Sequence, residues 1–141
     1  MSRIFLTVSA ILSVIVLGIL FWGLVSGKKQ PPAASGAALV SVQVPALEGD
    51  ALAGETLFRE NCASCHGDNA AGRDGIAPPL VHKIYEPGHH ADGAFLLAVS
   101  RGVRAHHWPF GDMPPVDGVS QEDVQKIVAY VRALQRANGI N

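Results

Sequence analysis

Cysteine and methionine are scarce in this 141-residue chain, and strand patterns and internal repeats are nearly absent from it. The sequence has two cysteines and two methionines, and aromatic residues make up 6% of it. Two cysteines exclude a four-cysteine zinc site, and no third cysteine is present to accept a lipid. Without period-2 alternation or a repeat, neither a β-sheet protein nor a repeat array is expected.

A surplus of positive charge is also missing. The chain has 11 Lys and Arg against 12 Asp and Glu, and its formal net charge is −1. Without residues 1–30, eight basic residues face twelve acidic ones. Since nucleic-acid binding needs a basic patch, no nucleic-acid partner is expected. A mildly acidic surface is either simply soluble or suited to a basic patch on a protein partner.

The N-terminus contains a long apolar run. Residues 4–25 have no charged side chain over 22 positions, which at helical rise crosses a hydrocarbon core of about 30 Å. Arg3 precedes the run, and Lys28 and Lys29 follow it. A cleaved signal peptide is the competing interpretation, but its apolar part usually has only about 7–15 residues. We therefore expect residues 1–27 to form a transmembrane anchor.

The next segment, residues 28–48, has the composition of a linker. Its first part contains Pro31, Pro32 and small residues that offer nothing to bury. Residues 39–45 alternate weakly between apolar and polar side chains, as a short extended segment on a domain surface would. We expect a flexible linker at residues 28–48 and a folded domain at residues 49–139.

Helical signals dominate this domain, so the predicted fold class is all-α. In chain order, the expected helices run from the N-cap Asp50 into Cys62, from Ala94 to a stop at Gly102, and from the N-cap Ser120 to Gly139. Aspartate and serine are favoured N-caps, and glycine suits a C-terminal stop. The last helix carries five apolar residues at helical spacing, which predicts one buried stripe: Val124, Ile127, Val128, Val131 and Leu134.

Both cysteines belong to the run Cys62-Ala63-Ser64-Cys65-His66. Two thiols three positions apart, followed at once by an imidazole, are typical of c-type haem attachment. On one helical turn the thiols can add to two vinyl groups of one porphyrin, and His66 then lies under the iron as its proximal ligand. A redox dithiol would need a βαβ pattern, and a zinc site two paired ligand clusters. Neither is visible, so we expect one covalent haem c.

Met113 is the candidate sixth ligand of the iron. The only other methionine is Met1, at the far end of the apolar run. Met113 is followed by Pro114 and Pro115, which stiffen the loop that would present its sulfur. A thioether ligand raises the potential, which suits an electron carrier. The competing interpretation is a loop methionine that fills a gap in the core.

Taken in order, these features resemble a class I cytochrome c domain, with one haem and His/Met ligation. The matches are the first helix ending at Cys62-Ala63-Ser64-Cys65-His66-Gly67, the stretch Pro78-Pro79-Leu80, the run Met113-Pro114-Pro115, and a C-terminal helix with Tyr130. The resemblance implies a small all-α fold around one covalent haem, here preceded by a single transmembrane helix. It also implies attachment of the haem outside the bacterial inner membrane, with the domain in the periplasm or an equivalent space.

The resemblance also implies roles for individual residues. The carbonyl of Pro78 should accept a hydrogen bond from Nδ1 of His66, which fixes the ring and tunes the iron. Four residues should join the first and last helices at a close crossing: Gly54, Phe58, Ile127 and Tyr130. These four would hold the fold and take no part in the chemistry.

Several loop residues have less certain roles. His82 stands alone, and His89-His90 and His106-His107 form two pairs. We interpret them as solvated side chains or as donors to a backbone carbonyl or a haem propionate. Alternatively, one of them binds the iron in place of Met113, or the pairs bind a second metal. Three residues before Met113 could donate hydrogen bonds to a haem propionate: Arg101, Arg104 and Trp108. The competing interpretation is that they provide surface charge or pack in the core. The family pattern does not specify residues 85–90 and 106–108, which are candidate partner contacts.

The function expected from these residues and from the resemblance is electron transfer. A membrane-tethered cytochrome would cycle Fe(III)/Fe(II) between a protein donor and a protein acceptor, alone or as the cytochrome subunit of a respiratory or dehydrogenase complex. It would have no catalytic residue and no small-molecule substrate. The alternatives are a haem enzyme or a gas- or peroxide-responsive sensor with a displaceable sixth ligand, and a structural subunit.

Overall fold

The structure is a computed structural model that describes residues 16, 18 and 35–141. The chain divides into two compact units, Met1–Pro32 and Ala33–Asn141. The predicted anchor, residues 1–27, and the first part of the predicted linker, residues 28–34, lie outside the described residues apart from positions 16 and 18. No helix among the described residues has both the length and the apolarity to cross a bilayer.

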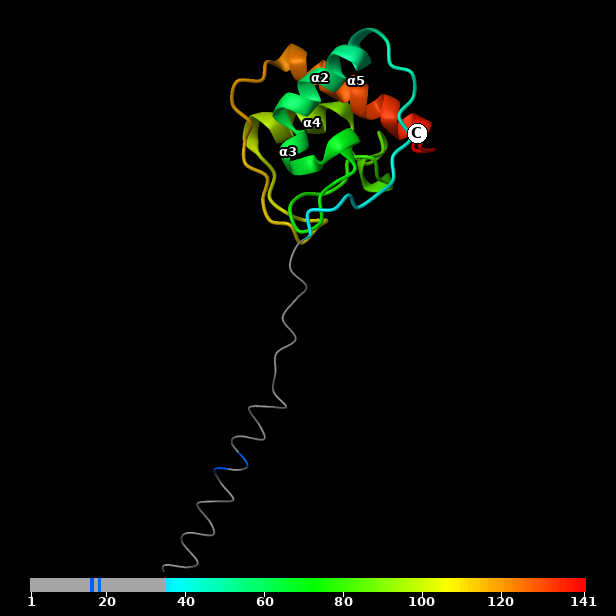
Figure 1. Cartoon of the computed structure of the whole chain (residues 1–141). Helices are drawn as coiled ribbons and strands as arrows, with labels where there is room; N and C mark the ends of the chain where they lie inside the picture. The colour runs from blue at the N-terminus through cyan, green and yellow to red at the C-terminus, as the bar shows by residue number, and fades with distance from the viewer. Residues whose placement is uncertain (1–15, 17, 19–34) are drawn as a thin grey trace, which may run out of the picture. The chain divides into compact units, whose positions relative to one another are not determined.

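The second unit is helical (Figure 1). Its elements are α2 (Gly49–Asn61), α3 (Ala63–His66), the 3-10 turns η1 (Asp68–Ala70) and η2 (Lys83–Tyr85), α4 (Asp92–Arg101) and α5 (Gln121–Ala137). Within the described residues, β-type pairing is limited to two isolated bridges, Arg73 with Ala77 and Val103 with Met113. The prediction of an all-α domain is confirmed for this part of the chain.

The boundaries of α4 and α5 follow the predicted signals closely. Ser120 is the N-cap of α5, and its hydroxyl accepts a hydrogen bond from the Asp123 N–H at 3.1 Å. Gly139 follows the helix with φ +77°, a conformation that glycine adopts at little cost. α4 begins at Asp92, two residues before its predicted start, and Gly102 ends it as predicted.

The N-terminus of α2 differs from the prediction. Glu48 is its N-cap, in extended conformation and without a side-chain hydrogen bond, and Gly49 is the first helical residue. The prediction of Asp50 as N-cap is therefore wrong, because Asp50 lies inside the first turn. Aspartate is favourable both at the N-cap and in the first turn, because the unpaired N–H groups and the positive end of the helix dipole attract its carboxylate at either position. Its presence in the sequence therefore does not separate the two positions.

The core lies where α2 packs on α5. A Cβ at Gly54 would overlap the carbonyl oxygen of Lys126, so only glycine allows the two backbones to approach this closely. One turn further on, the rings of Phe58 and Tyr130 lie 5.5 Å apart between centroids, tilted by 55°. The buried cluster comprises Phe58, Ala70, Val81, Ile127, Tyr130, Val131 and Leu134. The predicted helix contact and the buried stripe of the last helix are both confirmed.

Residues 35–48 run along this domain and hydrogen-bond to it. The Asp74 N–H donates to the carbonyl of Ala37 at 2.9 Å. Gln43 and the side chain of Asn138, at the end of α5, exchange two hydrogen bonds of 2.9 and 2.8 Å. Two apolar side chains of the segment also pack against the core, Val42 and Leu47. Residues 35–48 thus attach to the domain through backbone partners that local composition does not reveal, and residues 39–45 lie along it as an extended surface segment would.

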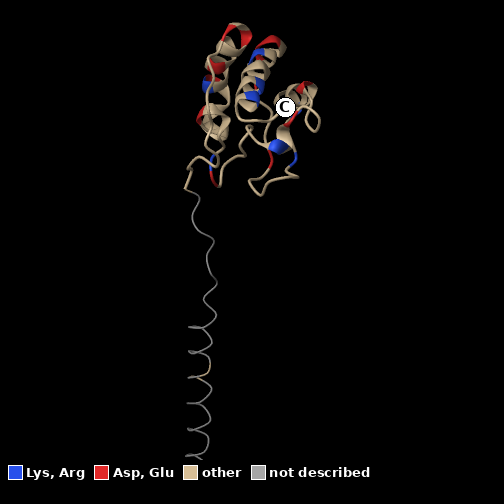
Figure 2. Ribbon diagram, turned by 90° about the vertical axis from the view of Figure 1, so that its right-hand side faces the viewer, with Lys and Arg blue, Asp and Glu red and all other residues tan. Residues whose placement is uncertain are grey.

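Charged residues lie on several helices and loops of the domain, and most reach solvent (Figure 2). Arg132 is a buried exception with 7% exposure. Its guanidinium donates to the carboxylate of Asp92 at 2.8 Å, to the carbonyl of Tyr85 at 2.6 Å and to the carbonyl of His90 at 2.5 Å. A buried charge is stable only when its donors are satisfied. Arg132 therefore ties the loop between η2 and α4 to α5.

Candidate functional site

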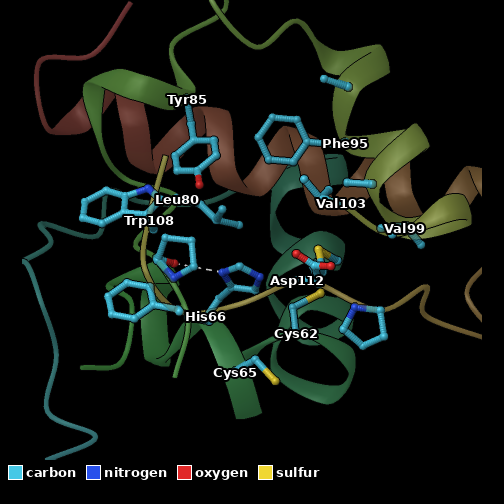
Figure 3. A pocket seen from close by; sticks show the side chains of 18 of the residues that line it. Cys62, Cys65, His66, Leu80, Tyr85, Phe95, Val99, Val103, Trp108 and Asp112 are labelled. Atoms are coloured by element: carbon cyan, nitrogen blue, oxygen red, sulfur yellow. Dashed lines mark hydrogen bonds between the residues drawn. The ribbon is translucent and has the colours of Figure 1, made fainter. Parts of the chain in front are cut away.

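A cavity of about 450 Å³ opens between the α2–α3 corner, α4 and the loop that precedes α5. Figure 3 shows His66 near its centre, with Tyr85 and Trp108 on one side and Phe95, Val99 and Val103 on the other. Most of its lining side chains are apolar. The predicted site residues all lie on its wall: Cys62, Cys65, His66, Pro78 and Met113.

The two cysteines reach the cavity through a tight corner in the chain. The Cys62 N–H donates to the carbonyl of Phe58 at 2.8 Å and so ends α2, while Cys65 lies in the single turn of α3. Both thiols are free. Burial, followed by the neighbouring Cys65, raises the pKa of Cys62 to about 11. Cys62 is therefore protonated at neutral pH, unlike the low-pKa thiolates of redox dithiols.

His66 ends α3 with one ring nitrogen already engaged. Its Nδ1 lies 2.9 Å from the carbonyl oxygen of Pro78, the contact expected from the family resemblance. Because a carbonyl only accepts, Nδ1 carries the proton and Nε2 keeps its lone pair. Burial lowers the pKa of His66, and the hydrogen bond to Pro78 opposes this in part. The ring is therefore a neutral imidazole, held in the tautomer that can bind a metal through Nε2.

Met113 is fixed by backbone pairing. Val103 and Met113 form an antiparallel bridge, with N–H to carbonyl distances of 2.9 Å in both directions. The preceding Gly102 has φ +73° and ψ 178°, and a Cβ there would lie 2.5 Å from the carbonyl oxygen of Met113. Inside the loop, the Ala105 N–H donates to the carboxylate of Asp112 at 2.8 Å. The loop thus brings a half-buried thioether to the same cavity as an imidazole 47 positions earlier in the chain.

The three candidate propionate donors separate in the structure. Trp108 lines the cavity, and its buried Nε1 makes no hydrogen bond of ordinary geometry within the described residues, although it lies close enough to the Tyr85 hydroxyl to oppose the rise in the pKa of Tyr85 that burial causes. A buried, unpaired N–H is unfavourable and calls for an acceptor. Arg101 also lines the cavity but is exposed, whereas Arg104 is exposed and does not line it. Trp108 is therefore the strongest of the three candidates.

The chemistry of these groups fits a covalently held haem c. Two free thiols three positions apart, a neutral imidazole with its Nε2 unpaired, a thioether and an unpaired indole N–H all border one apolar cavity. A zinc site would want further thiolate or imidazole ligands around the two cysteines, and the metal-ligand group found among the described residues includes neither cysteine.

The paired histidines also converge, which the sequence did not predict. His90 Nδ1 lies 2.6 Å from the carbonyl of Ile84, and His106 Nδ1 lies 2.8 Å from the carbonyl of Arg104, so both donate to the backbone. The Nε2 atoms of His89 and His107 are 3.4 Å apart. Partial desolvation and the neighbouring imidazoles lower the pKa of His107. The only sequence signal for this cluster is the occurrence of two adjacent pairs.

Known proteins resemble the chain over this domain. The cytochrome c family model matches residues 51–135, which include the cysteine–histidine run, Pro78 and Met113. A cbb3-type cytochrome c oxidase subunit FixP of Bradyrhizobium sp. (strain ORS 278) is 37% identical over 94 residues, covering 64% of this chain and 30% of the relative. The CcoP subunit of Rhodobacter capsulatus is 34% identical over 94 residues, covering 64% of this chain and 31% of the relative.

A further relative is the cbb3-type cytochrome c oxidase subunit CcoP of Rubrivivax gelatinosus, 35% identical over 106 residues, which cover 72% of this chain and 32% of the relative. The chain thus spans about a third of the length of the curated relatives it matches. The family match extends from the third residue of α2 almost to the end of α5, so it covers both sides of the cavity. The chain therefore belongs to the cytochrome c family.

Proposed function

We propose that this chain is a membrane-tethered electron carrier with one covalent haem c, working in a respiratory chain. The observation that carries the proposal is the convergence of Cys62, Cys65, His66 and Met113 on one apolar cavity. Haem bound there supplies an iron that changes between the ferric and ferrous states, one electron at a time.

Each residue has a distinct part in this proposal. Cys62 and Cys65 hold the porphyrin through thioether bonds, and His66 binds the iron through Nε2. Pro78 keeps the imidazole in the required tautomer through its carbonyl, 2.9 Å from Nδ1. Met113 would supply the sixth ligand of the iron, which would leave no open site for a gas or a peroxide.

The cavity wall limits the chemistry further. The half-buried apolar side chains of Phe95, Val99 and Val103 keep water from the porphyrin faces, and a low local dielectric disfavours the extra charge of ferric iron. Trp108 Nε1 donates to a propionate and thereby gains the acceptor it lacks among the protein groups. With His66 and Met113 both bound to the iron, the haem would exchange electrons without binding a substrate at the metal.

The place of the carrier follows from the rest of the chain and from its relatives. Residues 1–27 anchor it in the bacterial inner membrane, with the haem domain on the periplasmic or equivalent outer face. The relatives named as cbb3-type oxidase subunits support a donor and an acceptor within a respiratory chain, with an oxidase as the acceptor. The acidic balance of the domain suits a basic patch on such a partner.

Absorption spectroscopy of the full-length, haem-loaded protein tests the carrier. We expect a far-red Met-to-Fe(III) charge-transfer band and no carbon monoxide binding by the reduced form. Met113→Ala should abolish the band, lower the potential and admit carbon monoxide, whereas the exposed change Asp117→Asn should do none of these. Rapid carbon monoxide binding by the unmodified protein at neutral pH would refute the carrier and favour the enzyme or sensor. Mass spectrometry of the mature protein tests the anchor and the single haem together.

A further inference from the structure

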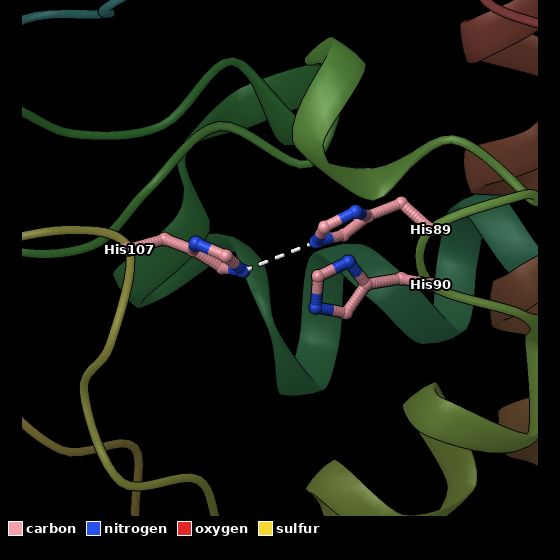
Figure 4. Close-up of side chains that lie close together, drawn as sticks. All are labelled: His89, His90 and His107. Carbon is pink, nitrogen blue, oxygen red and sulfur yellow. Dashed lines mark hydrogen bonds between the residues drawn. The ribbon is translucent and has the colours of Figure 1, made fainter.

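Three imidazoles from two separate loops meet beside the cavity (Figure 4). His89 and His90 lie between η2 and α4, and His107 lies in the loop that leads to Met113. One ring nitrogen from each of the three lies within 4.8 Å of the other two. The proposed electron transfer uses none of them.

The spacing within this trio matches that of ligands around a small metal ion. The Nε2 atoms of His89 and His107 are 3.4 Å apart. Two nitrogens that each bind a tetrahedral ion at about 2.0–2.1 Å lie about 3.4 Å from each other. One edge of a tetrahedron is therefore already formed, and a ring nitrogen of His90, which lies within 4.8 Å of the other two residues' ligand atoms, needs to approach by at most about 1.4 Å.

His90 is already oriented to act as the third ligand. Its Nδ1 donates to the carbonyl of Ile84 at 2.6 Å, which leaves Nε2 unprotonated. Its own carbonyl accepts from the buried guanidinium of Arg132 at 2.5 Å. Ring and backbone are thus both held, as they are in histidines oriented for a metal by their other ring nitrogen.

The chemistry of the trio selects a class of ion. Three imidazoles without a carboxylate suit zinc and copper, whereas calcium and magnesium require oxygen ligands. His89 and His107 are exposed, so a hydrated ion can reach the site and keep water as its fourth ligand. We propose that His89, His90 and His107 bind one divalent ion of the zinc and copper class. Because His90 and His107 also line the cavity, this ion lies at the rim of the haem site.

Metal titration of the full-length, haem-loaded protein tests the proposal. The protein is prepared without a histidine tag, in the ferric state and in a buffer that does not bind metals. Calorimetry with Zn²⁺ should show one equivalent bound. Copper(II) electron paramagnetic resonance should show one tetragonal site with nitrogen ligands. Because removal of an outer partner of a ligand alone weakens metal binding 10–100-fold, loss of a ligand should cost about 100-fold or more.

The decisive variants are His89→Gln and His107→Gln, with His106→Gln as the matched control. His106 is exposed, adjacent to His107 and outside the trio. The first two variants should each lose tight Zn²⁺ binding, and the control should keep it. An unchanged haem spectrum in all three shows that the fold is intact, and this readout does not depend on the metal.

Three results would overturn the proposal. The first is absence of stoichiometric Zn²⁺ binding to the unmodified protein. The second is equal affinity in the His89→Gln and His107→Gln variants, which would make the binding non-specific. The third is a changed axial-ligand spectrum of the haem in His107→Gln, which would make His107 an iron ligand instead. None of these bears on the electron-transfer proposal except the last, which would also displace Met113 from its role.

Discussion

Replacing Gly102 by alanine should detach Met113 from the cavity, although the substitution lies outside the loop that carries the methionine. Gly102 has φ +73° and ψ 178°, a region open almost only to glycine. An added Cβ would lie 2.5 Å from the carbonyl oxygen of Met113 and 3.1 Å from the ring of Pro115. Both neighbours are rigid, so the backbone has to move.

The magnitude follows from two effects. A non-glycine residue in this conformation costs about 1–3 kcal/mol. Separation of the two bridged segments also removes the two hydrogen bonds between Val103 and Met113, each worth about 0.5–1.5 kcal/mol. Together, with both hydrogen bonds lost, Gly102→Ala should lower the free energy of unfolding by about 2–6 kcal/mol. That is a large fraction of the stability of a small domain.

Two measurements on the haem-loaded, full-length protein check this result. Guanidinium unfolding followed by haem absorbance gives the stability, and the far-red band reports whether sulfur stays on the iron. Gly118→Ala is the matched control, because Gly118 also has positive φ (+81°) but a Cβ there would meet nothing within 4 Å. Gly118→Ala should lose only the stability that backbone strain costs, and it should keep the far-red band. A Gly102→Ala protein with the stability of the control and an intact band would refute the argument that Gly102 positions Met113.

Two further changes test the core contacts of Gly54 and Tyr130. Gly54→Ala places a methyl group on the carbonyl of Lys126, so α2 and α5 have to separate. We expect the free energy of unfolding to fall by at least about 1–3 kcal/mol in the same assay. Wild-type stability would contradict the close crossing of the two helices. Tyr130→Phe removes the hydroxyl that donates to Asn69 at 3.1 Å, at about 1 kcal/mol. Burial raises the pKa of Tyr130 from 10.0 to about 12, so between these pH values the phenol ionises in the unfolded chain before it does so in the folded one. The wild type should therefore lose stability as the pH rises from about 10 to 12, and the phenylalanine variant should lose less. Equal slopes of stability against pH in the two proteins would contradict this.

Local chemistry explains what the sequence predicted well. The run Cys62 to His66 identifies its own cofactor because two thiols and an imidazole must share one helical turn to reach one porphyrin. The cap at Ser120 and the apolar stripe of α5 are likewise properties of neighbouring residues, and both are present. Gly54 was placed only through the family resemblance, since its role depends on a backbone more than seventy positions away.

Apart from the first residues of α2 and α4, the features that the sequence missed depend on long-range contacts. Residues 35–48 look like a linker by composition, yet Gln43 pairs with Asn138, 95 positions further along the chain. His89 and His107 are 18 positions apart and carry no common motif, so nothing local indicates that their rings face each other. Such pairings become visible only when the path of both loops is known.

The two proposed axial ligands differ in what supports them. His66 follows directly from α2, which packs on α5 through the buried cluster around Phe58 and Tyr130. Met113 rests on a short bridge to Val103, at the end of a helix, α4, that has no buried residue although most of its side chains are apolar.

Those α4 side chains, with Phe95 and Val99 among them, face the cavity, so the group held there completes their burial. The Met113 side of the site would therefore depend more on the haem for its stability than the His66 side, which also rests on the buried cluster around Phe58 and Tyr130. Loss of the sixth ligand would then be a local opening of residues 103–113 that leaves the core folded. The choice between a carrier and a ligand-responsive sensor would thus depend on how firmly the bridge between Val103 and Met113 holds the sulfur, as well as on the identity of the sixth ligand.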